Sequence, residues 1–495
     1  MRFSFRAALL SCALFGAATI SSAHAADAAK PTPAAGTNDD HFTGVAALLP
    51  ADSVTKHHYG SIAYTAHAGT LTLRDAKGAP SARVFYVAYT KDGATAAKRP
   101  VAFFFNGGPG GGTAYLHLGA AGPVALTMPS KDPTDGAHAT LGDNPDSWLP
   151  GTDMVFIDAI GTGYSRATDP TKAAAQFYGV KQDASAFAKV IQLWIAQNNR
   201  QESPHYLVGE SYGGIRAIQV ANALQMEQNT LLDGLVMLSP AIEMPLLDTE
   251  DNPLSAALML PTLISAHQSP NTTPESADAA YQWAMSTYLT KIAGRLTDKD
   301  SAFYHDVAER TGLPESVITR QHGVPAVGSH DVMSIDGRLH GLYDYTQTIA
   351  DPAADGLDES PDPTLFGFGR AYGNAFSGYA ANALGFHTPL TYDLLSLSVN
   401  ASWKWSEGGP SPVHQIPVLN RLLALNPSMR IFVANGYYDL ACPFGTAHWL
   451  KDHLTVGSER VSLHLYQGGH MLYLRPESRH AFASDVQKWL EADTH

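Results

Sequence analysis

The sequence predicts an α/β fold built on a mostly parallel sheet with helices on both faces. Four short runs are entirely apolar, and several of them precede a glycine-rich turn, as expected for strands that are buried on both faces. These runs span residues 101–105, 154–157, 206–208 and 235–238. Between the second and third runs, residues 180–197 repeat apolar side chains at helical spacing, which predicts a helix with one apolar stripe.

Composition sets the broad class of protein. The chain has 495 residues, of which 45% are hydrophobic and 16% charged, a mixture typical of soluble globular proteins. Its length could hold about three average domains, or one large domain with insertions. Asp and Glu outnumber Lys and Arg, 46 to 32, and the net charge is −14. Because an acidic chain repels phosphate, nucleic acid and anionic membranes are disfavoured as partners.

The N-terminus has the pattern of a targeting segment. Two Arg precede an apolar, Ala-rich run, which ends in the small-residue site Ala23-His24-Ala25. We expect residues 1–25 to be a signal peptide cleaved after Ala25, so that the protein is periplasmic or secreted without stable membrane anchoring. An uncleaved anchor and a lipid anchor at Cys12 are the alternatives. Cleavage would remove Cys12 and leave Cys442 without a disulfide partner. Residues 26–45 are expected to be flexible.

The first part of the predicted core covers residues 46–245. Residues 58–90 alternate in the manner of strands, and turns are expected at Ala68-Gly69 and at 75–78, which together predict an antiparallel meander. The apolar runs described above then follow, with the helix 180–197 among them.

Residues 246–395 do not continue the alternation of strands and helices, and they are predicted to form a largely helical insertion or lid. Helical stretches are expected near 276–294 and 300–311. A loop rich in Pro and Asp runs from Asp351 to Pro363. A calcium site in it is conceivable, but the spacing matches no known ligand loop, and a solvated loop is expected. The core resumes over 396–495, with strands at 431–433 and 461–465 and a closing helix at 482–490.

A candidate nucleophile follows the third apolar run. Residues 209–214 read Gly-Glu-Ser-Tyr-Gly-Gly and precede a helical stretch from Ile215 to about Met226. The pattern G-x-S-x-G between a strand and a helix is the nucleophile elbow of α/β-hydrolases, which exposes the Ser on a sharp turn. Ser211 is therefore the predicted nucleophile. The alternative is a glycine-rich connector with a structural Ser.

A second glycine-rich loop, Asn106-Gly107-Gly108-Pro109-Gly110, follows the first apolar run. In this fold such a loop supplies the other backbone donor of the oxyanion hole. Glycines let backbone N–H groups approach a reacting carbonyl closely. A simple tight turn is the alternative.

A nucleophilic Ser needs a base, and the base needs an acid that orients it. The order in this fold is Ser, then Asp or Glu, then His. Asp439 and His470 each follow a late predicted strand in that order. His464, expected within a strand, and His480, expected on the surface of the last helix, are weaker candidates.

The sequence resembles the serine carboxypeptidases of peptidase family S10, in a bacterial form. The matching segments lie at 106–110 (NGGPG), 155–167 (VFIDAIGTGYSRA), 209–214 (GESYGG), 439–442 (DLAC) and 468–473 (GGHMLY). The resemblance implies an α/β-hydrolase fold with an insertion domain, a triad of Ser211, Asp439 and His470, and no metal or cofactor. It implies that the backbone N–H groups of Gly108 and Tyr212 form the oxyanion hole.

The resemblance further implies that Asn106, the Gly107 backbone and Glu210 receive the C-terminal carboxylate of a peptide substrate. Glu210 can do so only when one of the two carboxyl groups holds a proton, so such a site should favour acid pH. Arg216 is an alternative carboxylate anchor. No catalytic role is carried over for Asp158, which is expected in a structural loop.

The chain departs from the family at three points. Eukaryotic members usually have Trp-Leu before the Asn, where this chain has Phe104-Phe105, and Cys at the position of Gly111. They are also rich in disulfides. Cys442 matches a family thiol near the substrate, although a buried and inert Cys is equally expected.

The predicted function is that of an exported serine carboxypeptidase, which releases C-terminal residues from peptides with a free C-terminus through an acyl-enzyme. An esterase or acyltransferase on the same scaffold would need no carboxylate receptor. An enzyme like prolyl aminopeptidase would need an acidic pocket for a free amine.

Overall fold

The computed structural model describes residues 42–96, 99–129, 136–247, 252–294, 296–352, 361–406 and 414–492. The predicted signal peptide and nearly all of the stretch 26–45 lie outside these residues. Within the described ranges, no helix has both the length and the apolar character needed to cross a membrane.

A sheet of ten strands forms the centre of the molecule, in the order β1-β2-β3-β7-β4-β9-β10-β14-β15, with β8 paired to β3. Strands β1 to β3 form an antiparallel meander, and all pairs from β7 to β15 are parallel. The strands are β1 (Ser53–Tyr59), β2 (Ile62–Arg74), β3 (Pro80–Lys91), β4 (Val101–Phe105), β7 (Asp153–Ile157), β8 (Arg166–Ala167), β9 (His205–Glu210), β10 (Gly234–Leu238), β14 (Arg430–Gly436) and β15 (Val461–Tyr466).

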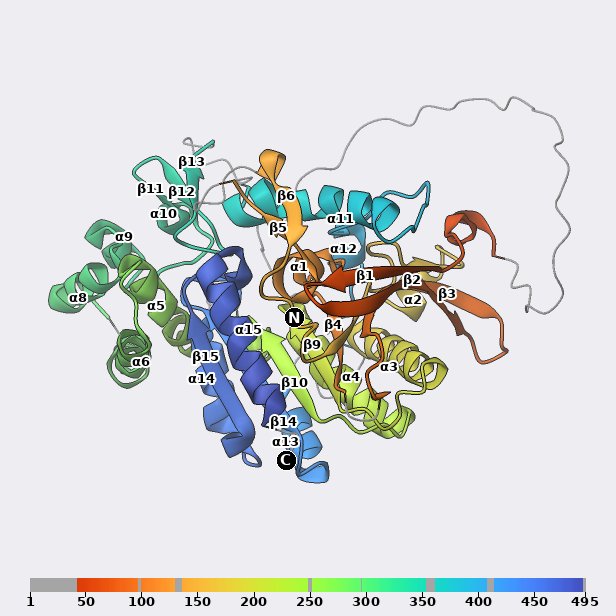
Figure 1. Cartoon of the computed structure of the whole chain (residues 1–495). Helices are drawn as coiled ribbons and strands as arrows, with labels where there is room; N and C mark the ends of the chain where they lie inside the picture. The colour runs from red at the N-terminus through yellow and green to blue at the C-terminus, as the bar shows by residue number, and fades with distance from the viewer. Residues whose placement is uncertain are drawn as a thin grey trace, which may run out of the picture.

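Helices cover both faces of this sheet (Figure 1). One face packs against α3 (Val180–Gln197), α4 (Tyr212–Glu227), α13 (Ile416–Leu425) and α14 (Phe444–His453). The other face packs against α15 (Pro476–Glu491), α11 (Ala371–Asn382) and the short α1 (Ala114–Leu116). The predicted fold class is confirmed: an α/β-hydrolase arrangement with a mostly parallel sheet.

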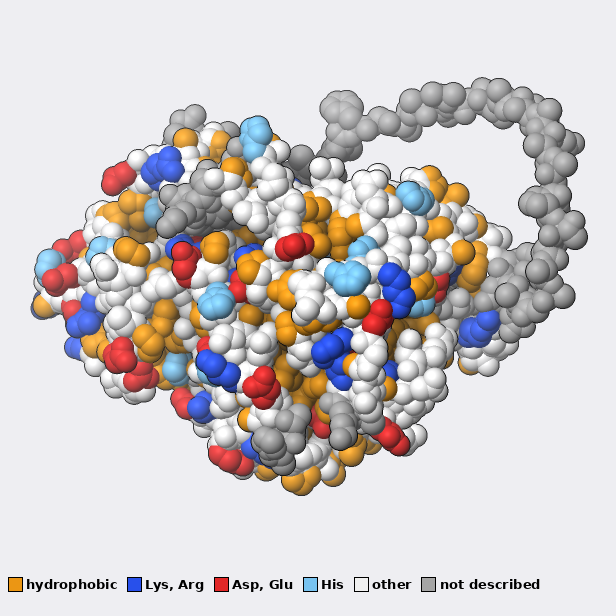
Figure 2. Space-filling model, viewed as in Figure 1, with side chains coloured by type: hydrophobic (Ala, Val, Ile, Leu, Met, Phe, Trp, Pro, Cys, Tyr) orange, Lys and Arg blue, Asp and Glu red, His pale blue; other side chains and the backbone are white. Residues whose placement is uncertain are grey.

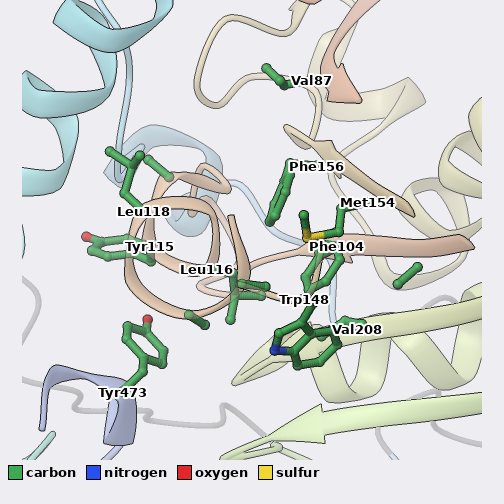
Figure 3. Packing of buried hydrophobic residues seen from close by; sticks show 14 of the residues in the cluster. Val87, Phe104, Tyr115, Leu116, Leu118, Trp148, Met154, Phe156, Val208 and Tyr473 are labelled. Carbon is green, nitrogen blue, oxygen red and sulfur yellow. The ribbon is translucent and has the colours of Figure 1, made fainter. Parts of the chain in front are cut away.

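Aromatic side chains fill the second of these faces beside β4. The rings of Phe104 and Phe156 stack with centroids 4.5 Å apart, and Trp148 packs on Phe104 at 5.2 Å. Figure 3 shows this stack on one side of the coil that follows β4, while Tyr473 reaches toward the coil from the C-terminal part of the chain. The ring of Phe104 is thus fixed inside the core, directly before the Asn106–Gly108 loop.

The segment 246–395 is largely helical and contributes a hydrophobic cluster of its own. Its described helices are α5 (Pro253–His267), α6 (Pro274–Trp283), α7 (Leu289–Ile292), α8 (Ser301–Thr311), α9 (Glu315–Arg320), α10 (His330–Met333) and α11. Helices α5, α6, α8 and α9 form the green group to one side of the sheet in Figure 1. Helix α5 packs on α14, where a side chain in place of Gly445 would meet the Leu258 carbonyl oxygen at 2.2 Å. The helical group is therefore joined closely to the core.

Smaller elements complete the described chain. A two-stranded sheet pairs β5 (Val124–Thr127) with β6 (Thr140–Asp143), and a three-stranded sheet joins β11 (Ser334–Ile335), β12 (Arg338–His340) and β13 (Thr348–Ala350). The remaining short α-helices of the described residues are α2 (Ala173–Gln176) and α12 (Leu397–Ala401). On the face shown in Figure 2, acidic and basic side chains are interspersed rather than gathered into one charged stripe.

Two local predictions are wrong. The chain does not turn at Ala68-Gly69, because β2 runs through both residues, and β1 and β2 meet at Gly60 instead. Gly69 lies within β2 because the Asp52 carboxylate occupies the space of a side chain there, 2.3 Å from an added Cβ. The loop predicted from Asp351 to Pro363 is contradicted only at its described end, because residues 353–360 lie outside the described residues. Its described part includes Asp362, whose carboxylate accepts the N–H groups of Leu342, Tyr343 and Leu365.

Candidate active site

Ser211 lies at the sharp turn between β9 and α4. Its backbone has φ 63° and ψ −127°, a left-handed conformation that is strained for a residue with a side chain. The turn requires glycines around it, since a Cβ at position 209 would lie 2.1 Å from the Gly213 carbonyl oxygen. The spacing G-x-S-x-G therefore has a steric cause here, and the turn leaves the Ser211 side chain only partly buried.

Asp439 and His470 form a buried pair beyond the ends of β14 and β15. The ring nitrogen Nδ1 of His470 lies 2.9 Å from Oδ2 of Asp439, and the two side chains are 2% and 0% exposed. The other oxygen of Asp439 accepts the Cys442 N–H at 2.9 Å. Burial by itself lowers the pKa of His470, but the adjacent Asp439 carboxylate outweighs it and raises the pKa well above the usual value.

The thiol of Cys442 connects this pair with Ser211. It interacts with the His470 ring and with the Ser211 side chain, so the structure brings Ser211, Asp439 and His470 to one place. Burial raises the pKa of the Cys442 thiol, which keeps it protonated. Nε2 of His470 is buried and has no hydrogen-bond partner among the described residues. Of the alternatives, His464 lies within β15, and the His480 side chain is 78% exposed on α15.

The Asn106–Gly108 loop lies against the start of α4. A Cβ on Gly107 would meet the Tyr212 backbone nitrogen at 2.5 Å, so only glycine allows this approach. Gly108 has φ 103°, which also favours glycine, and it is exposed. Tyr212 is the first residue of α4, and its N–H has no carbonyl partner within the helix. The loop therefore touches the Ser211 turn at Gly107, next to Gly108.

Glu210 and Asn106 form a buried polar pair beside Ser211. Nδ2 of Asn106 donates to Oε1 of Glu210 at 3.0 Å, and Glu210 is 4% exposed. Burial raises the pKa of Glu210 to about 7, against a usual value of 4.5. The charge of His470, and then the phenol of Tyr473, hold the pKa below what burial alone would give. Oε2 of Glu210 is buried, and no described residue offers it a well-oriented hydrogen bond.

Arg216 is not available as a carboxylate anchor. Its guanidinium group is fully buried in an ion pair with Asp183, with Nε 2.7 Å from Oδ2, and it also donates to the Asn106 carbonyl oxygen. Asp158, whose role is expected to be structural, accepts the Thr113 and Tyr164 N–H groups and the Tyr392 hydroxyl in the interior.

Two residues at the site, Tyr473 and Tyr343, are not predicted as site residues from the sequence. Tyr473 lies in the GGHMLY segment, only three residues after His470, and its ring could have been inferred to lie near the site from that spacing. Tyr343 packs edge-on against the His470 ring, with centroids 4.8 Å apart. It belongs to the insertion, where no motif marks it. The described residues contain no His, Cys, Asp and Glu group that could hold a metal ion.

Comparisons with known proteins find a similar family and a similar fold. Residues 60–283 match the family model of the serine carboxypeptidases, Peptidase_S10. Carboxypeptidase sxa2 of Schizosaccharomyces pombe is 30% identical over 131 residues, which make up 25% of this chain and only 22% of that protein. The crystal structure of Kex1(delta)p, a prohormone-processing carboxypeptidase from Saccharomyces cerevisiae, aligns with 86% of this chain and 91% of its own, with a TM-score of 0.57 at 17% identity, and shares the fold. Over residues 60–283, the chain is therefore similar to the serine carboxypeptidases of peptidase family S10.

Proposed function

We propose that the protein is an exported serine carboxypeptidase that removes C-terminal residues from peptides through an acyl-enzyme. The observation that carries the proposal is the protonatable Glu210, held by Asn106 directly beside the elbow Ser. A simple esterase has no use for a buried acid at this point. Export rests on the targeting pattern of residues 1–25.

In the proposed reaction, Oγ of Ser211 attacks the carbonyl carbon of the last peptide bond while Nε2 of His470 takes the hydroxyl proton. Asp439 fixes Nδ1–H and stabilises the imidazolium that forms, in keeping with the raised pKa of His470. The N–H groups of Gly108 and Tyr212 stabilise the oxyanion. His470 then passes its proton to the departing amino group, and a water molecule hydrolyses the ester on Ser211.

The substrate's free carboxylate would lie against Asn106, the Gly107 backbone and Glu210. Because the pKa of Glu210 is about 7, this side chain holds a proton at mildly acid pH and can donate it to the carboxylate. Above that range two negative charges would face each other. In this proposal Glu210 binds the carboxylate as a neutral hydrogen-bond donor, not as a positive charge such as that of Arg. Its affinity for the carboxylate therefore falls as the pH rises.

The test compares an N-blocked dipeptide with a free C-terminus and its C-terminal amide from pH 5 to pH 8. We expect KM for the acid to climb as Glu210 loses its proton, while KM for the amide changes little. Glu210→Gln keeps a donor but cannot titrate, so it should flatten the KM profile of the acid and leave that of the amide unchanged.

Ser211→Ala is the control for the nucleophile. It should lose at least about three orders of magnitude in rate with both substrates, as expected when a member of a triad is removed. Parallel KM profiles for acid and amide in the wild type would contradict the carboxylate receptor and favour the esterase. Normal turnover by Ser211→Ala would contradict the triad itself.

A further inference from the structure

One segment of the insertion passes between the two loops that carry Asp439 and His470. This segment, residues 342–345, is named here the strap; it lies in the connection between β12 and β13, which belong to the small sheet labelled β11, β12 and β13 in Figure 1. The Leu342 carbonyl oxygen accepts the Leu440 N–H at 3.0 Å, and the Tyr345 N–H donates to the Tyr438 carbonyl oxygen at 3.0 Å. The strap thus bonds to the residue on each side of Asp439.

The strap also holds the histidine loop. The Tyr343 carbonyl oxygen accepts the backbone N–H of His470 at 2.6 Å, and the Tyr343 ring contacts the imidazole edge-on. The strap lies so close to the histidine loop that position 469 requires glycine, because a Cβ on Gly469 would lie 2.1 Å from the Tyr343 carbonyl oxygen. A displacement of the Tyr343 peptide would therefore be passed directly to His470.

A single carboxylate fixes the other side of this peptide. Asp362 Oδ2 accepts the N–H groups of Leu342, at 2.6 Å, and Tyr343, at 3.2 Å. Oδ1 of the same side chain accepts the Leu365 N–H at 2.8 Å, which ties the strap to the segment leading into α11. A continuous series of contacts therefore leads from Asp362 through the Tyr343 peptide to His470.

We propose that Asp362 is a positioning residue for the reaction proposed above: by fixing the Tyr343 peptide, it sets the orientation of the His470–Asp439 pair. The inference rests on the proposed function, because it assigns His470 as the base. Its consequence is that the insertion helps to assemble the triad. Asp362 touches no substrate in this role and acts only through the strap.

The proposal is tested with Asp362→Ala and Asp362→Asn, the second of which keeps the shape and one acceptor oxygen. The probe is a Ser-directed phosphonate, whose labelling rate depends on the triad but not on a free C-terminus. The endpoint of labelling counts the folded sites, and the rate constant per site reports the alignment of the base. Asp300→Ala is the matched control, since Asp300 also accepts a backbone N–H in the insertion, that of Thr297, but caps an exposed turn far along the chain from the strap.

We expect Asp362→Ala to lower the labelling rate constant per site, and kcat for a peptide, by about 10- to 100-fold, as displacements of about 1 Å do. KM should stay within about twofold. Asp362→Asn should fall between Asp362→Ala and the wild type, and Asp300→Ala should match the wild type. A rate constant per site equal to that of the wild type in both Asp362 variants would overturn the inference, even if the melting temperature fell. Absence of labelling in the wild type would instead overturn the proposed nucleophile, and this inference with it.

Discussion

Glu210 is an acid in a place that disfavours its charge. It is 4% exposed, and no Lys or Arg among the described residues pairs with it. Asn106 is its hydrogen-bond donor of good geometry, and the Tyr473 phenol lies close by. Because burial outweighs these contacts, the folded protein binds a proton here that the unfolded chain would release at the same pH.

This difference predicts how stability changes with pH. The folded pKa of about 7 lies above the usual value of 4.5, so the contribution of Glu210 is fully present below pH 4.5 and is lost as pH rises through 7. The loss is on the order of 3 kcal/mol. In Glu210→Gln it should vanish, so urea unfolding at pH 5 and pH 8 should show a smaller decrease in the free energy of unfolding than in the wild type. An equal decrease in both proteins would contradict the raised pKa.

Individual site residues could be predicted from the sequence where a reactive side chain stands at a position that the backbone of the fold fixes. Ser211, Asp439 and His470 could be selected because each follows a strand end in a fixed order, and the structure brings them together. The competing assignment of Arg216 could not be settled in advance. Its partner, Asp183, is 33 positions away, and only the packing of two helices joins them.

The helices α3 and α4 are joined by that pair, and the pair also supports the loop after β4. Arg216 on α4 bonds to Asp183 on α3 and to the Asn106 carbonyl oxygen, and its guanidinium group lies over the Phe187 ring at 4.9 Å. The charges are buried at 0% and 5% exposure. An arrangement of this kind links two helices to the loop that carries Gly107 and Gly108.

Removing one partner of the pair should therefore be costly. Asp183→Asn leaves the Arg216 charge buried without its counterion, and we expect a loss of about 3–5 kcal/mol in the free energy of unfolding. Asp306→Asn is the control, since its ion pair with Arg310 is 40% and 41% exposed and should contribute less than about 0.5 kcal/mol. Urea titration followed by circular dichroism measures both. A loss in Asp183→Asn no larger than in the control would show that the pair adds nothing to stability.

Helices and strands whose apolar residues repeat with one clear period could be predicted from the sequence. Those without such a period could not. The helix expected at 180–197 matches α3, and the buried strands match within a few residues. Helix α5 was missed because it is buried on almost all sides, so that residues 255–265 show no polar face, and Pro261 interrupts the pattern. A turn at Gly69 would break β2 in two, but this glycine is in the strand because its small size makes room for Asp52.

At the scale of the whole molecule, the insertion and the core share their packing. Leu440, next to Asp439, belongs to the hydrophobic cluster that is otherwise built by residues 256–349. Helix α5 lies against α14 with backbone contact at Gly445. The strap adds backbone hydrogen bonds to both triad loops. The two parts therefore cannot separate without breaking buried contacts.

We expect the protein to unfold in one cooperative transition. Far-ultraviolet circular dichroism, which follows the helices of both the insertion and the core, should give the same urea midpoint as the fluorescence of tryptophans such as Trp148 and Trp194, which are buried against the central sheet. Hydrogen exchange should show the same global protection in α5 and β10. Two separate midpoints, with the helical signal lost first, would contradict the shared packing.

The change of pattern at residues 246–395 predicts an insertion, but the contacts of this segment with the rest of the chain could not be predicted from the sequence. Asp362, Tyr343 and Gly469 lie at separate positions in the sequence. Neither Asp362 nor Tyr343 belongs to a recognisable motif. Their meeting depends on the three-dimensional course of the β12–β13 connection. Sequence periodicity carries no information about such a path.

The position of the triad loops along the chain has a consequence for biosynthesis. Ser211 and the strap are synthesised before His470, which follows Ser211 by 259 residues (470 − 211). Strands β14 and β15 must still join the sheet beyond β10 before Asp439 and His470 can meet. A chain made only as far as β10 therefore carries Ser211 without the two partners that the proposed reaction assigns to it.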